Sequence, residues 1–318
     1  MRYEKNNTML HRSSGSTSRG PSRAMSEWRP DRLLPGFEAL ELAFPDDYDG
    51  PVVATLVRLP VANAPRGAVL YVHGFADYFF QQHLAQRFAA EGYAFHALDL
   101  RKHGRSLREH QHPNFCKSVA EYYADIDRAL EVIGGPVLVA GHSTGGLICS
   151  LYAHEGARRD AVRALWLNSP FFEWRLPDWR RPHLHLAAAM GRFFPFLNDR
   201  ESLRADYTEQ LLEHWEFDLG LKPLRGFGVY YGWIGAITDA HAKVHAGLRL
   251  TCPVLSMHSD EADIVLDWRH IARWSRHLGE RVTVLAFPGA LHDVVLSRPE
   301  IREEVFRQLF AWAEQAIA

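Results

Sequence analysis

Short apolar runs alternate with longer amphipathic segments along most of this chain. Several runs have the length of buried strands and almost no polar side chain, and they lie at 68–72, 94–98, 137–140, 164–167, 254–257 and 282–287. Helical spacing or a terminal glycine marks the segments at 80–91, 119–133, 143–155, 268–277 and 300–316. This alternation predicts an α/β fold whose mainly parallel sheet is covered by helices on both faces.

The pattern changes at two places. Before the first buried run, 37–44 and 52–59 predict two more strands, joined by a turn at 45–50 that is rich in Asp, Pro and Gly. Between 170 and 249, helix-like pieces remain, no clear strand is visible, and aromatic residues, Pro and Arg accumulate. We interpret residues 170–249 as an insertion that divides the core into 31–169 and 250–318.

The N-terminal stretch has no such pattern. Residues 1–30 are dominated by Ser, Arg and Gly, and they lack the apolar centre of a signal peptide and the arginine pair of a twin-arginine signal. Such a segment cannot bury enough apolar surface to order itself, so we expect a disordered tail. Met25 is an alternative start of the chain.

Composition and charge exclude some function classes. Hydrophobic residues make up 47% and charged residues 23%, and 36 basic against 38 acidic residues give a net charge of -2. This balance creates no field that attracts a polyanion, so we expect no nucleic-acid partner. No apolar run reaches the roughly 18 residues of a membrane span. Three distant cysteines (Cys116, Cys149 and Cys252) without CxxC spacing suit a reducing compartment, so we expect a cytoplasmic protein.

One serine lies between two glycines where a predicted strand meets a predicted helix. The sequence is Gly141-His142-Ser143-Thr144-Gly145. A sharp strand-to-helix turn exposes the serine oxygen at the helix N-terminus, where the dipole favours a developing negative charge, and the small residues let neighbouring segments approach. The context predicts that Ser143 is a nucleophile. A glycine-rich helix cap without chemistry is the alternative.

A nucleophilic serine needs a base, and His292 has the right position for it. It follows the last predicted strand and precedes the last helix, where a fold with this turn places its general base. The chain has 18 histidines, so position rather than residue type selects this one.

The acid that orients the base should follow the run at 254–257, because this fold uses the order serine, acid, histidine. Asp263 precedes the apolar stretch 264–266, which should pack its loop down, and it is our choice. Glu261 is a further candidate in the same loop, Asp260 is the competitor, and Asp267 fits better as the N-cap of the next helix.

Two backbone N–H groups should bind the oxyanion that forms during attack. Thr144, directly after the nucleophile, should supply one of them. The loop after 68–72 reads His73-Gly74-Phe75, and Phe75 is our choice for the second donor. Gly74 would let the backbone bend close to the substrate oxygen.

Four motifs occur in order along the chain. They are His73-Gly74-Phe75, Asp99-Leu100-Arg101-Lys102-His103-Gly104-Arg105-Ser106, Gly141-His142-Ser143-Thr144-Gly145-Gly146 and Gly289-Ala290-Leu291-His292-Asp293. Together they resemble the monoacylglycerol lipase and lysophospholipase branch of the α/β-hydrolases, also called the serine aminopeptidase S33 type, over about residues 35–315. The resemblance implies an α/β-hydrolase fold, a helical cap inserted after the sixth strand, and no cofactor.

The chain departs from that family in two loops. The family's first loop often reads HGxG and continues with a Glu-His pair, whereas Phe75-Ala76-Asp77-Tyr78 stands in this chain. The family's acid loop commonly has Gly, two residues and then Asp, whereas this chain has His258-Ser259-Asp260-Glu261-Ala262-Asp263.

The expected reaction is acyl transfer from a lipophilic, monoacylglycerol- or lysophospholipid-like ester to water. We expect substrate contacts from Gly74, His142, Phe171 and Phe172, and transient contact of the aromatic cap with lipid surfaces. The cap aromatics either line an acyl pocket or form the cap's own core. The arginines of the insertion either bind an acidic substrate group or are solvated or paired. They are Arg175, Arg180, Arg181 and Arg192.

Other readings of the same residues remain open. A peptidase, an amidase or an acyltransferase would use the same triad, whereas a binding module on a hydrolase scaffold would typically have lost the serine or histidine. A serine at the turn excludes an epoxide hydrolase or dehalogenase, which needs an aspartate. A metal site at His103, His110 and His112 lacks a completing ligand, so we expect Asp99, His103 and Arg105 to organise their loop instead.

Overall fold

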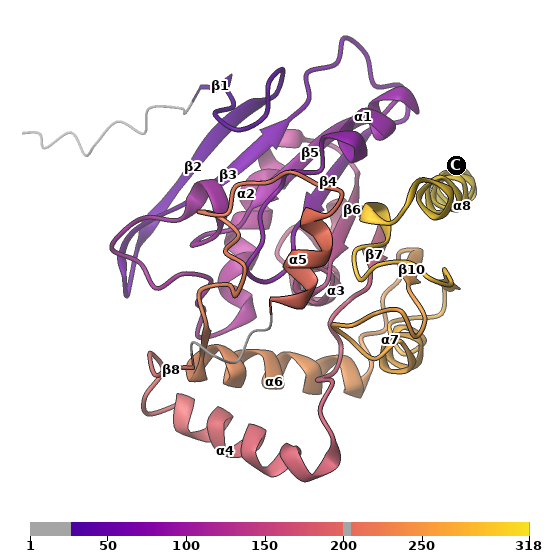
Figure 1. Cartoon of the computed structure of the whole chain (residues 1–318). Helices are drawn as coiled ribbons and strands as arrows, with labels where there is room; N and C mark the ends of the chain where they lie inside the picture. Colours follow the sequence, from indigo (N-terminus) through magenta and orange to yellow (C-terminus); the bar gives the residue numbers. More distant parts are fainter. Residues whose placement is uncertain (1–26, 200–204, 318) are drawn as a thin grey trace, which may run out of the picture.

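The computed structural model describes residues 27–199 and 205–317, and its centre is a nine-stranded sheet (Figure 1). The strand order is β1-β2-β3-β5-β4-β6-β7-β10-β11, in which the pairs from β5 to β11 are parallel and β1, β2 and β3 join antiparallel. The strands are β1 Arg29–Pro30, β2 Glu38–Asp47, β3 Gly50–Arg58, β4 Ala68–Val72, β5 Ala94–Asp99, β6 Val137–His142, β7 Val162–Asn168, β10 Val254–His258 and β11 Val282–Ala286.

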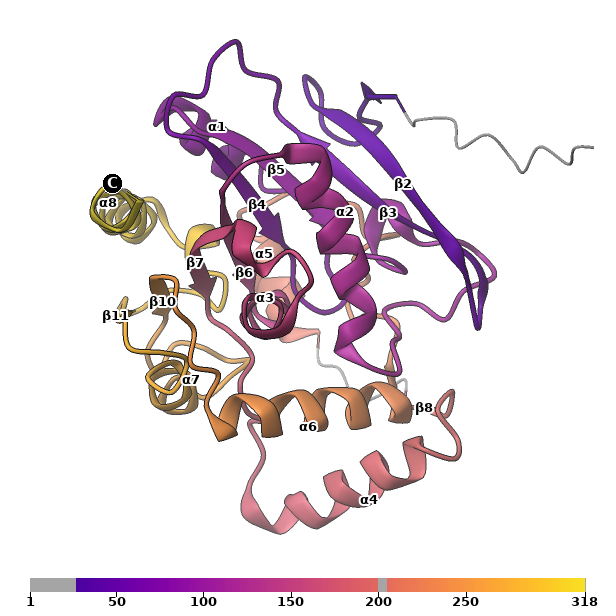
Figure 2. The same ribbon diagram turned by 180° about the vertical axis from the view of Figure 1, so that it is seen from behind.

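Helices cover both faces of this sheet, which explains why its central strands, such as β4 and β6, are almost wholly apolar and buried. In β4, Val69 and Tyr71 belong to the core on one face, and Leu70 and Val72 belong to the core on the other. The first core includes residues of α1 Gln82–Ala90 and α8 Pro299–Ile317 (Figure 1). The second includes residues of α2 Tyr123–Ile133, α3 Thr144–Glu155 and α7 Trp268–Ser275 (Figure 2).

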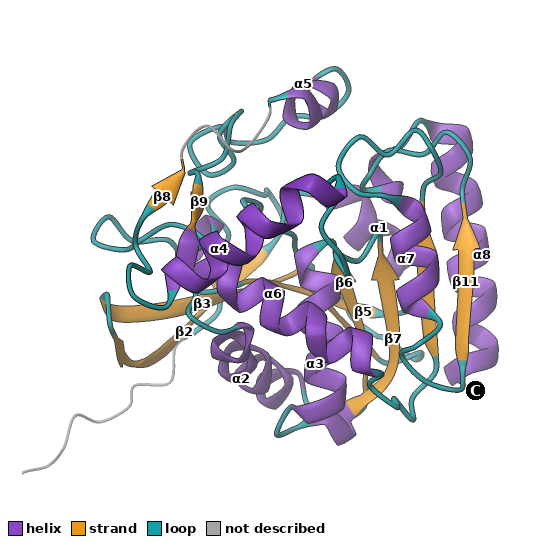
Figure 3. Ribbon diagram, turned by 90° about the horizontal axis from the view of Figure 1, so that it is seen from below, coloured by secondary structure: helices purple, strands orange, loops and turns teal. Residues whose placement is uncertain are grey.

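Residues 170–249, which we call the cap segment, contribute no strand to this sheet in their described part. They form α4 Arg181–Gly191, α5 Asp206–Leu212 and α6 Tyr231–Ala246, with α4 packed on α6 (Figure 3). A Cβ at Gly191 would lie 2.2 Å from the carbonyl oxygen of Tyr231, so only glycine permits this close approach. One prediction was wrong in detail, because β8 Asn198–Asp199 and β9 Val229–Tyr230 form a short antiparallel pair.

The predicted elements of the core are confirmed with shifted ends. The hairpin turn is narrower than expected, because Asp47 pairs with Gly50 and the Asp47 carboxylate accepts the N–H of Asp49 at 2.7 Å. The predicted tail lies outside the described residues up to position 26, and its last residues, Arg29–Pro30, pair with β2. Single-turn 3-10 helices complete the chain at Gly104–Ser106, Val119–Tyr122, Arg159–Ala161, Asp178–Arg180 and Val294–Leu296.

Among the helices of residues 27–199 and 205–317, none has the length and apolar character that crossing a bilayer requires.

Candidate active site

Ser143 lies at a strained turn between β6 and α3. Its φ is +52°, a region that non-glycine residues rarely occupy. Close backbone packing enforces this turn: a Cβ at Gly145 would lie 2.3 Å from the His73 oxygen, and one at Gly141 would lie 2.5 Å from the Gly145 oxygen. The backbone of Ser143 is also held on both sides, because its N–H donates to Asn168 and its carbonyl accepts the N–H of Phe171.

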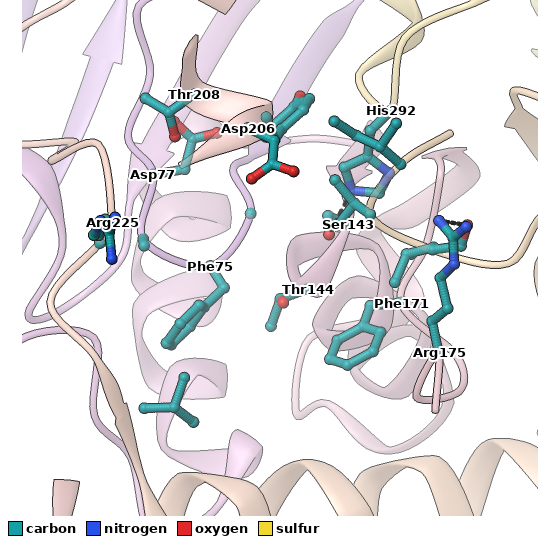
Figure 4. A pocket seen from close by; sticks show the side chains of 18 of the residues that line it. Phe75, Asp77, Ser143, Thr144, Phe171, Arg175, Asp206, Thr208, Arg225 and His292 are labelled. Carbon is teal, nitrogen blue, oxygen red and sulfur yellow. Dashed lines mark hydrogen bonds between the residues drawn. The ribbon is translucent and has the colours of Figure 1, made fainter. Parts of the chain in front are cut away.

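The structure brings His292 to the serine. Its Nε2 is 3.0 Å from the Ser143 Oγ, a hydrogen-bond distance, and the ring is buried (Figure 4). The side chain comes from the loop after β11, which reaches over the turn that carries Ser143. Tyr207 of α5 packs its ring edge-on against the imidazole, with 5.5 Å between ring centroids.

Asp263 completes the constellation on the far side of the imidazole. Its Oδ2 is 2.9 Å from the His292 Nδ1, and its Oδ1 accepts the N–H groups of Val265 and Leu266 at 2.7 and 2.9 Å. Burial would raise the pKa of this carboxyl, but the His292 ring and the two backbone N–H groups outweigh it and lower the pKa. The group is therefore a carboxylate over the neutral pH range, as an orienting acid must be.

The two competing carboxylates occupy other places. The Oδ1 of Asp260 accepts the N–H of Gly289 at 3.0 Å, so this side chain ties the acid loop to the loop that carries His292. Asp267 caps α7 by accepting the N–H of Arg269 at 2.9 Å, as predicted.

Both predicted oxyanion donors lie beside Ser143. Thr144 is the first residue of α3, so its N–H has no acceptor within the helix. Phe75 borders the same space from the loop after β4. Gly74 lets that loop approach the serine closely, because a Cβ at this position would lie only 3.2 Å from the Ser143 Cβ.

A cavity of about 610 Å³ opens above these residues, between the sheet edge and the cap segment. Of the four residues expected to contact substrate, Gly74, His142 and Phe171 line this cavity and Phe172 does not. Both phenylalanine rings belong to the core that includes residues of α3 and α6, but Phe172 is wholly buried there, whereas Phe171 is 7% exposed and also borders the cavity. Trp174 and Trp233 line the cavity too, whereas Trp179, Phe193 and Phe194 are exposed on the cap segment.

Charged residues lie at opposite sides of this cavity. Figure 4 shows Asp77, Asp206 and Arg225 on one side of Ser143 and Arg175 on the other. The Nη1 of Arg175 donates to the carbonyl oxygen of Asp263 at 2.8 Å, so this arginine supports the acid loop.

The other arginines of the insertion differ in their surroundings. Arg180 lines the cavity and stacks on Trp179, whereas Arg181 forms ion pairs with Glu173 and Asp178.

Sequence reasoning missed the residues that hold the His292 loop. The carboxylate of Asp293 is buried and accepts hydrogen bonds from Asn168 at 2.6 Å and from Gln81 at 3.2 Å. The Oδ1 of Asn168 accepts the N–H of Val294 at 3.1 Å. The adjacency of Asp293 to His292 was a usable signal, but nothing local indicated that Gln81 and Asn168 lie beside it.

The loop with several histidines is built as a structural unit. Asp99 accepts the Phe79 N–H at 2.8 Å and an Arg105 guanidinium N–H at 2.9 Å. His103 is fully buried, and burial lowers its pKa to about 3. Within residues 27–199 and 205–317, no group of three or more His, Cys, Asp or Glu side chains is arranged to hold a metal ion.

Most of the chain is similar to known proteins. A model of the family described as serine aminopeptidase, S33 matches residues 63–298. A monoacylglycerol lipase of Mycolicibacterium smegmatis is 27% identical over 256 residues, which cover 74% of this chain and 84% of the relative.

Solved structures share the fold. A monoacylglycerol lipase of Paleococcus ferrophilus is 25% identical, with a TM-score of 0.65 over 81% of this chain and 98% of that one. A soluble variant of monoglyceride lipase from Saccharomyces cerevisiae is 20% identical, with a TM-score of 0.68 over 87% of this chain and 96% of that one.

Proposed function

The chain belongs to the serine aminopeptidase S33 family of α/β-hydrolases, and from this premise we propose that it cleaves lipophilic carboxylic esters with Ser143, His292 and Asp263. The observation that carries the proposal is a pair of successive hydrogen bonds. The Asp263 Oδ2 is 2.9 Å from the His292 Nδ1, and the His292 Nε2 is 3.0 Å from the Ser143 Oγ. A nucleophile, its base and the base's orienting acid have this mutual geometry in acyl-transfer enzymes.

The proposed reaction has two half-reactions. His292 takes the proton of Ser143 as the serine oxygen attacks the ester carbonyl, and the N–H groups of Thr144 and Phe75 bind the oxyanion. His292 then protonates the leaving alcohol, which departs and leaves an acyl-enzyme. Water enters, gives its proton to His292 and attacks the acyl carbon, and the acid product leaves as the serine recovers its proton.

The lipophilic part of the substrate is inferred from the cavity and from the relatives. Phe171, Trp174 and Trp233 present aromatic surface near Ser143, which suits an acyl chain. The matched proteins are named monoacylglycerol or monoglyceride lipases, so a monoacylglycerol- or lysophospholipid-like ester is the proposed substrate class.

We propose further that α4 rests on an anionic lipid surface. Leu186 of α4, Trp179 in the 3-10 helix before it and Phe193 just after its end are large apolar side chains with exposed fractions of 59%, 66% and 80%. Phe194 beside them is 64% exposed. Arg180 lies next to Trp179 and lines the cavity, so the apolar face is continuous with the site and adjoins positive charge.

The proposed activity is tested with a fluorophosphonate probe and a set of p-nitrophenyl esters of increasing acyl length. Wild-type protein should be labelled and should turn over the esters, whereas Ser143→Ala should do neither. Matched p-nitroanilides separate an esterase from an amidase. Equal ester turnover by wild type and Ser143→Ala would refute the mechanism.

A further inference from the structure

The loop of residues 73–81 carries the proposed oxyanion donor Phe75, and its two ends are fixed within the core. At the start, the Nε2 of His73 accepts the N–H of Leu100 at 3.1 Å. At the end, the N–H of Phe79 donates to the Asp99 carboxylate at 2.8 Å. These anchors leave the middle of the loop to be held by other contacts.

The cap segment supplies such contacts. The Phe75 ring packs against Trp233 of α6 at an interplanar angle of 34°, with 4.0 Å between ring centroids. The hydroxyl oxygen of Tyr78 accepts the N–H of Asp218 at 2.7 Å. Ala76, between them, has a φ of +50°, so the surrounding contacts must offset a strained backbone.

A further contact of this kind is a buried ion pair between Asp77 and Lys222. The Lys222 Nζ is 2.6 Å from the Asp77 Oδ1, and the two side chains are 6% and 5% exposed. The same Asp77 oxygen accepts the N–H of Tyr78 at 3.0 Å, so the pair acts directly on the backbone of the loop. Aromatic rings surround the ammonium, with Phe80 and Phe217 at 5.5 and 5.7 Å.

In a buried ion pair, each charge also compensates the other in a place that water hardly reaches. Loss of one partner leaves a charge without compensation in a poorly solvated place, and the loop would move to bring that charge to water. The displaced part is two residues from the Phe75 N–H. Because oxyanion stabilisation depends on donors already aimed at the reacting oxygen, even a small displacement lowers the rate.

We propose that Lys222 is a positioning residue for ester hydrolysis: through Asp77, the cap segment holds the Phe75 N–H where the oxyanion forms. The inference rests on the proposed function and adds that docking of the cap segment and assembly of the oxyanion site are one event. The cap segment thus supports catalysis as well as covering the cavity.

The test compares Lys222→Met and Lys222→Arg with Lys243→Met, using p-nitrophenyl butyrate. Lys243 is the matched control, because it also joins the cap segment to the core, by a 2.7 Å pair with Glu155 whose two side chains are 49% and 33% exposed. For Lys222→Met, kcat should fall between about tenfold and a hundredfold, with KM changed by less than about threefold. Lys222→Arg should retain most activity, and Lys243→Met should match wild type.

A trifluoromethyl ketone separates positioning from general loosening. Ser143 adds to its carbonyl, the serine proton passes to His292, and the adduct places an oxyanion between the two donors. Its inhibition constant should rise for Lys222→Met by the same factor by which kcat/KM falls. Unchanged inhibition alongside slower turnover, or turnover equal to that of Lys243→Met, would overturn the proposal.

A double variant covers the case in which Lys222→Met does not fold. Asp77→Asn with Lys222→Met leaves no lone charge but also no ion pair between the cap segment and the loop, so it should fold and recover only part of the kcat that Lys222→Met loses. Full activity of the double variant would also overturn the proposal. If wild type fails to cleave esters, or Ser143→Ala still does, the proposed function fails instead, so the two failures are distinguishable.

Discussion

The Asp263 carboxylate and the His292 imidazole are 2.9 Å apart, although 29 residues separate them along the chain and each belongs to a different loop. Both side chains are almost wholly buried. Burial of the pair fixes which ring nitrogen faces the acid, and the other nitrogen then faces Ser143.

Replacement of the acid tests this relationship. Asp263→Asn keeps the side-chain shape but presents an amide that can hold the wrong imidazole tautomer, so kcat should fall by about 10⁴. Asp260→Asn is the control, because an amide oxygen can still accept the Gly289 N–H, and it should stay near wild type. Steady-state kinetics on a short ester measures both, and a greater loss for Asp260→Asn would reassign the acid.

The proposed lipid contact predicts a partitioning defect that leaves chemistry intact. Phe193→Ser with Phe194→Ser removes two exposed rings, so binding to anionic vesicles should weaken by at least about tenfold. Turnover of a soluble butyrate ester should not change, because neither ring lines the cavity. Val61→Ser, which changes an exposed apolar residue between β3 and β4, should bind vesicles as wild type does. Equal vesicle binding by all three proteins would contradict a lipid-docking face.

Two buried histidines make folding sensitive to mild acid. Burial lowers the pKa of His103 and of His241 to about 3, from 6.5 in an unfolded chain. Below pH 6.5 the unfolded chain therefore binds more protons, and the free energy of unfolding falls as pH drops from 6.5 towards 3. Each histidine contributes about 1.4 kcal/mol per pH unit within that window.

Urea unfolding between pH 7 and pH 5 measures this effect. His103→Asn removes one of the titrating groups, so the variant should lose less stability per pH unit than wild type, by an amount close to one proton. His154→Asn, at an exposed position of α3, serves as the comparison and should follow the wild-type slope. An unchanged slope for His103→Asn would show that this ring is not neutral in the folded state.

Close packing at the serine turn predicts a stability cost for a single methyl group. In Gly145→Ala the new Cβ would lie 2.3 Å from the His73 oxygen and 2.4 Å from the Val72 oxygen, so the backbone must move. We expect unfolding free energy to fall by about 2–3 kcal/mol, measured by urea titration. Gly220→Ala meets only the Asp218 carboxylate, at 3.0 Å, and a side chain can turn away. A cost for Gly145→Ala no larger than that of Gly220→Ala would rule out the packing argument.

The parts of the fold that local pattern controls were predictable. Strands buried on two faces need uninterrupted apolar runs, and β4 at Ala68–Val72 matched its prediction at both ends. The α/β-hydrolase class followed from the alternation and the motif order, and the family match confirms it. Positions for the nucleophile, base and acid followed from chain order at the ends of strands, and their mutual distances agree with the roles proposed for them.

Contacts between polar side chains that are distant in the sequence could not be predicted. Lys222 lies in a stretch without clear periodicity, and nothing near it indicates that its partner is Asp77, 145 residues away. Phe171 lines the cavity and Phe172 does not, and this difference depends on how the chain leaves β7 and packs against the cap segment. Such contacts are set by tertiary structure and leave no local signature.

The order of strands in the sheet also bears on how the protein is made. β10 and β11, which precede the acid and base loops, join the sheet beyond β7 only after the entire cap segment has been synthesised. On the proposed mechanism, a nascent chain on the ribosome would therefore contain Ser143 long before His292 is available to activate it. Reactivity towards esters would therefore arise only as translation nears its end.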